Sequence, residues 1–168
     1  MVYSLPTLVD GLAVAGSYQA ANTTGSGSTA LGATYSGIEG LSLSYGQGSS
    51  DDVKGKSGDQ TIMKASYAYG PITVAASNND YDDETSGNDQ EVSSVSLSYT
   101  VSDQISVSYG EETIDRSGKT SDIEVTGVSI SYTSGGMTAS FAQVEAENVD
   151  HTAGLDKEVW NIGLSFAF

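Results

Sequence analysis

The chain has 168 residues, enough for one domain of ordinary size, and carries 22 acidic against 6 basic residues, a formal net charge of −16. This charge excludes nucleic-acid binding by electrostatic attraction, because phosphates would repel the chain. The sequence has no cysteine and no apolar run near the ~20 residues of a transmembrane helix. We therefore expect no disulfide, no thiolate metal site and no helical membrane span, and the opening residues show no signal-peptide pattern.

Tyrosines recur at a nearly fixed interval along the chain. The spacings are 32, 32, 32 and 33 residues between Tyr3, Tyr35, Tyr67, Tyr99 and Tyr132. Each tyrosine is followed by a turn sequence and then by an apolar residue that opens the next segment. A period of this length indicates one repeated supersecondary unit.

The segments beside these turns alternate between apolar and small polar residues. Val128, Ile130 and Tyr132 alternate with Ser129 and Ser131, and such period-two alternation is the signature of a strand. The same pattern is found in 41–45, 72–76, 95–99, 105–109 and 160–168. We expect an all-β fold with about eleven antiparallel strands in up-and-down order, forming a single domain over residues 1–168.

Two kinds of connection are expected to alternate along the chain. The turns on the tyrosine side are short. Long polar loops are expected on the other side, near 19–28, 47–60, 78–90, 111–122 and 145–157. These loops and the adjoining strand ends hold most of the acidic residues, which predicts an accumulation of cations at that end and a weak cation preference.

The two faces of the predicted strands differ in a way that favours a membrane barrel. One face carries valine, isoleucine, leucine and tyrosine, whereas the other is mostly serine, glycine, alanine, threonine and asparagine. Small polar residues cannot fill the interior of a barrel of this size. A wet lumen with an apolar outer face fits a transmembrane β-barrel, in which the five repeated tyrosines would form an aromatic girdle. The alternative for these tyrosines is cross-strand packing in a soluble sheet.

The ends of the chain and its hairpins resemble a known family. The opening YSLPTLVDGLAVAGSYQ, the repeated tyrosine-turn-apolar hairpins and the closing WNIGLSFAF are similar to the C-terminal two-thirds of a Gram-negative general porin of alphaproteobacterial type. The resemblance implies an N-terminally truncated part of a barrel of about 16 strands, located in the outer membrane as a homotrimer. It also implies a signal for the barrel-assembly machinery at Ile162, Leu164, Phe166 and Phe168.

Few residues stand out as candidates for specific chemistry. Lys64 lies mid-strand on the face opposite Met63 and is predicted to line the pore, where a cation could shape selectivity. Asp80, Asp82, Asp83 and Glu84 offer hard oxygen ligands for weak binding of Ca²⁺ or Mg²⁺; they lack the EF-hand spacing, and the alternative is a solvated acidic loop. No other cofactor is expected.

The function expected from these features is a non-enzymatic, water-filled channel for passive diffusion of small hydrophilic solutes and ions. Its partners would be membrane lipid and lipopolysaccharide, with no nucleic acid. His151 is the single histidine and is read as a surface loop residue, since a catalytic histidine needs a positioned partner. The alternative function is a soluble or surface-exposed β-rich binding or adhesion protein that acts through its acidic loops.

Overall fold

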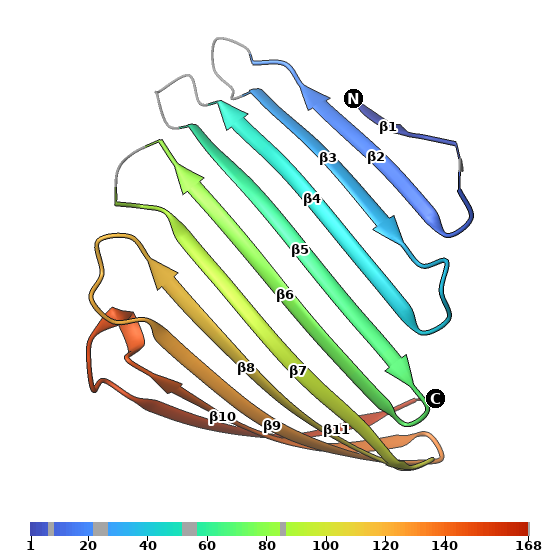
Figure 1. The fold of residues 1–168 in the computed structure, drawn as a ribbon. Helices are drawn as coiled ribbons and strands as arrows, with labels where there is room; N and C mark the ends of the chain where they lie inside the picture. The colour runs from blue at the N-terminus through green and yellow to red at the C-terminus, as the bar shows by residue number, and fades with distance from the viewer. Residues whose placement is uncertain (7–8, 22–26, 52–56, 85–86, 168) are drawn as a thin grey trace.

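The computed structural model describes residues 1–6, 9–21, 27–51, 57–84 and 87–167. These residues form one sheet of eleven strands, each hydrogen-bonded to its neighbours in chain order and antiparallel to them (Figure 1). The prediction of an all-β, up-and-down fold is confirmed. The strands are β1 (Val2–Ser4), β2 (Leu12–Gln19), β3 (Gly27–Tyr35), β4 (Leu41–Asp51), β5 (Ser57–Tyr69), β6 (Ile72–Asp83), β7 (Gln90–Ser102), β8 (Ile105–Arg116), β9 (Ile123–Ser134), β10 (Met137–Glu147) and β11 (Lys157–Phe166).

The strands extend further toward the long connections than the sequence predicted. The loop expected near 47–60 is strand up to Asp51 and again from Ser57, and the loop expected near 78–90 is strand up to Asp83. These strand ends are polar on both faces, so they lack the alternation that marks a strand in sequence. Between β10 and β11 lies a short 3₁₀ turn, η1 (Val149–His151). Helices long and apolar enough to cross a membrane were not found among the described residues.

The short connections on the tyrosine side are tight turns, as predicted. Residues 70–71 join β5 to β6, and residues 135–136 join β9 to β10. Gly70 and Gly135 have φ angles of +56° and +58°. Positive φ angles of this kind suit the tight hairpin turns that match the twist of the flanking strands. These turns fix the register, which runs without interruption from Tyr69 opposite Ile72 up to Gly58 opposite Asp83.

The sheet is a single curved layer with two different faces (Figure 1). Tyr132, Ile130 and Val128 lie on one face of β9 and are exposed, whereas Ser129 and Ser131 on the other face are half-buried. Curvature crowds the concave side of a sheet, so we call the serine face the inner face and the apolar face the outer face. The described residues contain no buried apolar side chain, and the molecule therefore has no conventional core in this part.

Candidate functional site

Hydroxyl groups line the inner face in cross-strand pairs. The oxygen–oxygen distances are 2.8 Å for Ser77 and Ser94, 2.7 Å for Ser106 and Ser131, and 2.7 Å for Ser108 and Ser129. A hydroxyl donates one hydrogen bond and accepts two, so a paired serine still has capacity for water. Water can thus hydrate the inner face at these serine pairs, where the small side chains leave space beside the wall.

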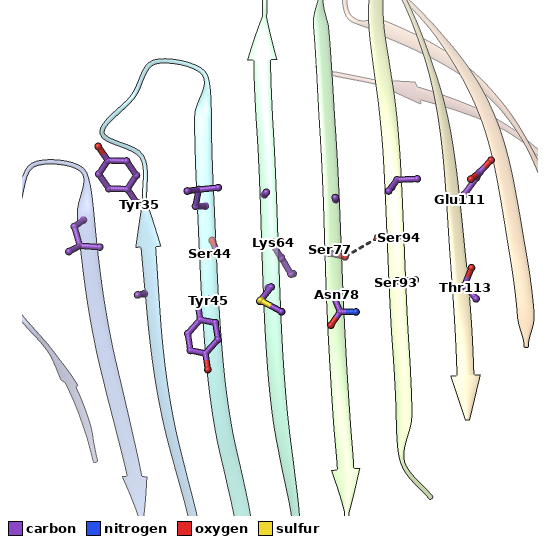
Figure 2. A pocket seen from close by; sticks show the side chains of 17 residues that line it. Tyr35, Ser44, Tyr45, Lys64, Ser77, Asn78, Ser93, Ser94, Glu111 and Thr113 are labelled. Carbon is purple, nitrogen blue, oxygen red and sulfur yellow. Dashed lines mark hydrogen bonds between the residues drawn. The ribbon is translucent and has the colours of Figure 1, made fainter. Parts of the chain in front are cut away.

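Lys64 lies on the inner face of β5. Its neighbours across the sheet are Ser44 on β4 and Ser77 on β6. Figure 2 shows Lys64 in this row, beside the hydrogen bond between Ser77 and Ser94. The side chain is exposed, so its ammonium group is accessible from the inner side of the sheet. Its position agrees with the sequence analysis, and its effect on passing ions stays a prediction.

Charged residues are divided unequally between the two faces. The inner face of the described strands carries Lys64, Asp83, Glu112, Arg116 and Lys157. An acidic rim lies on the outer face toward the long connections, formed by Asp51, Asp59, Asp80, Asp82, Glu91, Glu111, Asp115, Glu124, Glu145, Glu147 and Glu158. Strand alternation turns these residues away from the inner face, so they do not line the pore side, and the predicted cation preference stays a prediction.

An aliphatic patch interrupts the polar inner face and was missed in the sequence. Val92, Ile114 and Ile123 lie side by side on β7, β8 and β9. Val125 follows on β9, and Val144 lies on the same face of β10. In the sequence these aliphatic residues alternate with acidic residues of the outer face, so the segments that contain them resemble polar loops rather than strands. The alternation of Glu124 and Glu145 with aliphatic neighbours was the signal that could have revealed them.

The five repeated tyrosines lie together on the outer face. Each lies near the short-turn end of its strand, and Tyr67 stacks on Tyr69 with ring centroids 6.5 Å apart. The set is Tyr3, Tyr35, Tyr67, Tyr99 and Tyr132. This placement is the one that the girdle hypothesis requires, and their role at a membrane interface stays a prediction.

A second aromatic row lies further along the outer face and was not predicted. Tyr45 donates a hydrogen bond to Gln47 Oε1 at 3.2 Å, and Tyr109 donates one to Glu111. Trp160 is 67% exposed on β11. In β4 and β8 the tyrosine is followed by a polar residue two positions later, a spacing visible in the sequence. The outer face is thus apolar between two aromatic rows.

The residues of the predicted assembly signal lie on β11. Ile162, Leu164 and Phe166 share the outer face and are 75%, 59% and 56% exposed. Phe168 lies outside the described residues. The alternation of the three described residues agrees with the sequence pattern, and recognition by the assembly machinery stays a prediction.

The four candidate cation ligands do not converge. Asp80 and Asp82 lie on the outer face of β6, Asp83 on its inner face, and Glu84 just beyond the strand. The pKa of Asp82 is raised above its ordinary value, chiefly by repulsion from Asp89 and further by two other carboxylates. Within the described part of the chain, no group of three or more acidic or histidine residues is arranged to hold a metal ion. A Ca²⁺ or Mg²⁺ site here stays a prediction.

His151 holds the connection after β10 against the connection after β8. Its Nδ1 donates to the Ser121 carbonyl oxygen at 2.9 Å, and Asn148 Nδ2 donates to the Asp122 carbonyl oxygen at 3.0 Å. The ring nitrogen therefore bonds to a backbone carbonyl and not to a serine hydroxyl. This geometry differs from the nucleophile–base pair of a hydrolase and agrees with a surface role for His151.

Comparison with known proteins identifies the fold family. The family model described as Gram-negative porin matches residues 1–151. A porin structure refined at 1.8 Å resolution superimposes with a TM-score of 0.72 at 18% identity, over 99% of this chain and 60% of that chain. OmpT, an outer membrane protein of Vibrio cholerae, gives a TM-score of 0.71 at 14% identity, over 98% and 62% of the two chains. The chain thus spans about three-fifths of these two structures.

A smaller porin is also similar. The KdgM porin, solved in complex with disordered oligogalacturonate, gives a TM-score of 0.53 at 13% identity, over 99% of this chain and 90% of that chain. No match is found among curated protein sequences. The family match confirms the predicted location in the bacterial outer membrane. With a family model covering most of its length, this chain belongs to the Gram-negative porin family.

Proposed function

We propose that the chain forms part of the wall of an outer-membrane channel for passive diffusion of small hydrophilic solutes and ions. The observation that carries the proposal is the inversion of polarity between the two faces. The apolar outer residues are exposed and the described part has no buried core, whereas the inner face carries paired hydroxyls. Lipid on the outer side and water on the inner side satisfy both faces.

Strand direction supports a larger barrel than these eleven strands. Neighbours are antiparallel throughout, so β1 and β11 run in the same direction. A direct β1–β11 pair would be parallel, whereas bacterial single-chain barrels are antiparallel with an even number of strands. An odd number of further strands between β11 and β1 gives antiparallel closure. Five further strands meet this condition and give the barrel of about 16 strands expected from the sequence.

The inner face supports weak discrimination between ions. Its charges in the described strands are three basic and two acidic residues, so they nearly balance. Lys64 and Glu112 lie in one row across the sheet, separated by Ser77 and Ser94. We assign the main influence on small ions to this pair, because the outer acidic rim is separated from the inner face by the sheet itself.

We propose that the protein assembles as a homotrimer. The barrel-assembly machinery would recognise Ile162, Leu164 and Phe166 on β11 and insert the chain into the membrane. Its apolar outer face would contact membrane lipid. Its acidic rim would lie at the level of lipopolysaccharide, whose phosphates require divalent cations beside carboxylates. A catalytic role is not proposed, since His151 bonds to a backbone carbonyl.

Conductance of the reconstituted protein tests the function. Native protein extracted with detergent from the outer membrane would be inserted into planar bilayers and its single-channel conductance recorded in salt. Discrete steps that scale with bulk salt conductivity are expected of a water-filled pore. Absence of steps from folded, inserted protein would refute the channel. Recovery only in the detergent-free soluble fraction would favour the binding-protein alternative, and an intact mass well above that of 168 residues would support the larger barrel.

A further inference from the structure

The apolar zone of the outer face is short along strands β4 to β10, and on β11 it is one outward position longer, from Phe166 to Trp160. We define the apolar belt as the outward residues in 41–45, 63–67, 72–76, 95–99, 105–109, 128–132 and 137–141. Each range contributes three outward positions, because alternate residues point to opposite faces. On β5 the outward Tyr69, opposite Ile72, adds a fourth. Beyond the belt the strands continue with a hydrophilic outer face. We propose that this wall is matched to a hydrocarbon layer distinctly thinner than the ~25 Å apolar band of typical outer-membrane barrels.

Strand β6 gives the height of the belt. Its outward residues are Ile72, Val74 and Ala76, followed by Asn78 and then Asp80. Ile72 and Ala76 are four residues apart, which is about 14 Å at ~3.4 Å per residue and about 10 Å of height at a tilt of ~40°. Asp80, eight residues from Ile72, lies about 21 Å above it on the same basis.

Neighbouring strands repeat this sequence of zones. On β7 the belt ends at Val95, and Ser93 and Glu91 follow it. On β9 the belt ends at Val128 and is followed by Thr126 and Glu124. Uncharged polar residues therefore form a polar rung directly above the belt on six strands, at Gln47, Thr61, Asn78, Ser93, Thr126 and Gln143. On β8 the acidic Glu111 takes this position.

The polar rung and the acidic rim limit how far the hydrocarbon layer can extend along the outer face. Asn78 Nδ2 donates to Glu91 Oε1 at 2.6 Å, so the rung on β6 is bonded to the rim. Carboxylates lose their hydration in hydrocarbon, and charged residues on a lipid-facing wall are destabilising there. A short apolar surface is accommodated by local thinning of the bilayer. The surface thus fits a thin or locally thinned bilayer, an inference that rests on the proposed membrane-channel function.

The proposal can be tested by extending the apolar belt by one outward position and measuring which acyl-chain length then gives the highest yield of folded protein. The variant Thr61→Val, Asn78→Leu and Ser93→Val makes the rung apolar on β5, β6 and β7. The matched control is Ser66→Val, Ala75→Leu and Ser96→Val, three neighbours on the inner face of the same strands. Wild type and both variants of the full protein would be folded into phosphatidylcholine vesicles of increasing acyl-chain length. The folded fraction would be read from heat-modifiable electrophoretic mobility and from Trp160 emission.

The belt proposal predicts a shift only for the outer variant. Its yield maximum should move to longer chains by at least one member of the lipid series, because one added outward position on each strand raises the apolar height by about 5 Å. The control should keep the wild-type maximum. An unmoved maximum for the outer variant, or an equal shift for both variants, would overturn the proposal. If the triple variant does not fold in any lipid, Ser93→Val alone must shift the maximum in the same direction.

Conductance recorded from the same vesicles separates this inference from the channel proposal. Protein that inserts with the expected chain-length shift but conducts no ions would refute the channel and leave the belt assignment intact. Protein that conducts ions but shows no chain-length shift would support the channel and refute the belt assignment.

Discussion

Replacing Gly40 by alanine is expected to destabilise the sheet more than the same replacement at Gly70. Both residues have positive φ angles, +76° and +56°, and a side chain in this region costs about 1–2 kcal/mol. A Cβ at Gly40 would lie 2.2 Å from the Ala68 carbonyl oxygen, whereas nothing lies within 4 Å of one at Gly70. The overlap would displace the turn and weaken the 2.8 Å hydrogen bond from Ala68 N to Gly40 O, worth about 1 kcal/mol.

The expected losses are thus about 2–3 kcal/mol for Gly40→Ala and about 1–2 kcal/mol for Gly70→Ala. Both variants would be unfolded by urea from vesicles, with emission of the single tryptophan, Trp160, as the reporter. The midpoint should fall more for Gly40→Ala. Equal midpoints would refute the argument, because they would mean that the Ala68 carbonyl does not confine the turn.

Three further predictions concern charge and the outer face. Lys64→Glu should raise cation over anion permeability, by up to about sixtyfold before salt screening, since a unit charge ~7 Å from an ion contributes about 0.6 kcal/mol in water and the two-unit change acts with opposite signs on cation and anion, about 2.4 kcal/mol in all. Reversal potentials in a salt gradient measure this, and Glu111→Gln on the outer face should leave them unchanged. Because its folded pKa is raised, Asp82 adds stability only at pH below its unfolded value and loses it as pH rises through the folded value. Asp82→Asn should therefore resist urea better than wild type at neutral pH, and the difference should vanish in acid. Tyr99→Ala should lower the thermal stability of the inserted protein, by the loss of an aromatic side chain from the outer face, while Ser98→Ala on the inner face should not.

The fold was predictable wherever one face of a strand is apolar. The alternation in 128–132 indicated both the strand and the residues that share its apolar face, and the turn at Gly135 was evident from the paired glycines. The ends of β5, β6 and β7 were not predictable in this way. There Asp80 and Asp82 face outward while Asn79 and Asp83 face inward, so neither face is apolar and hydrophobic periodicity carries no signal. Backbone pairing with the next strand, which is a non-local interaction, decides the structure of these segments.

The candidate site was predictable to the same limited extent. Lys64 could be placed inward because it interrupts a strand whose outward residues, Met63 and Tyr67, are apolar. The outward direction of the acidic rim could not be inferred while its residues were read as loop. Once Glu124 and Glu145 belong to strands, alternation alone turns them to the outer face. The error in loop length thus concealed the outward direction of the acidic rim, and the ion preference stays a prediction.

The open inner face and the missing core have one physical origin. A wall that must leave room for water cannot be stabilised by large side chains on its inner side, so stability has to come from backbone pairing and from lipid on the outer side. A short apolar belt limits the lipid contribution. The β5–β6 pairing continues beyond the belt to Gly58 opposite Asp83, and the β6–β7 pairing continues to Tyr81 opposite Gln90. These additional backbone hydrogen bonds offset the short belt, and they explain why hydrophilic segments that resemble loops in sequence are built as strands.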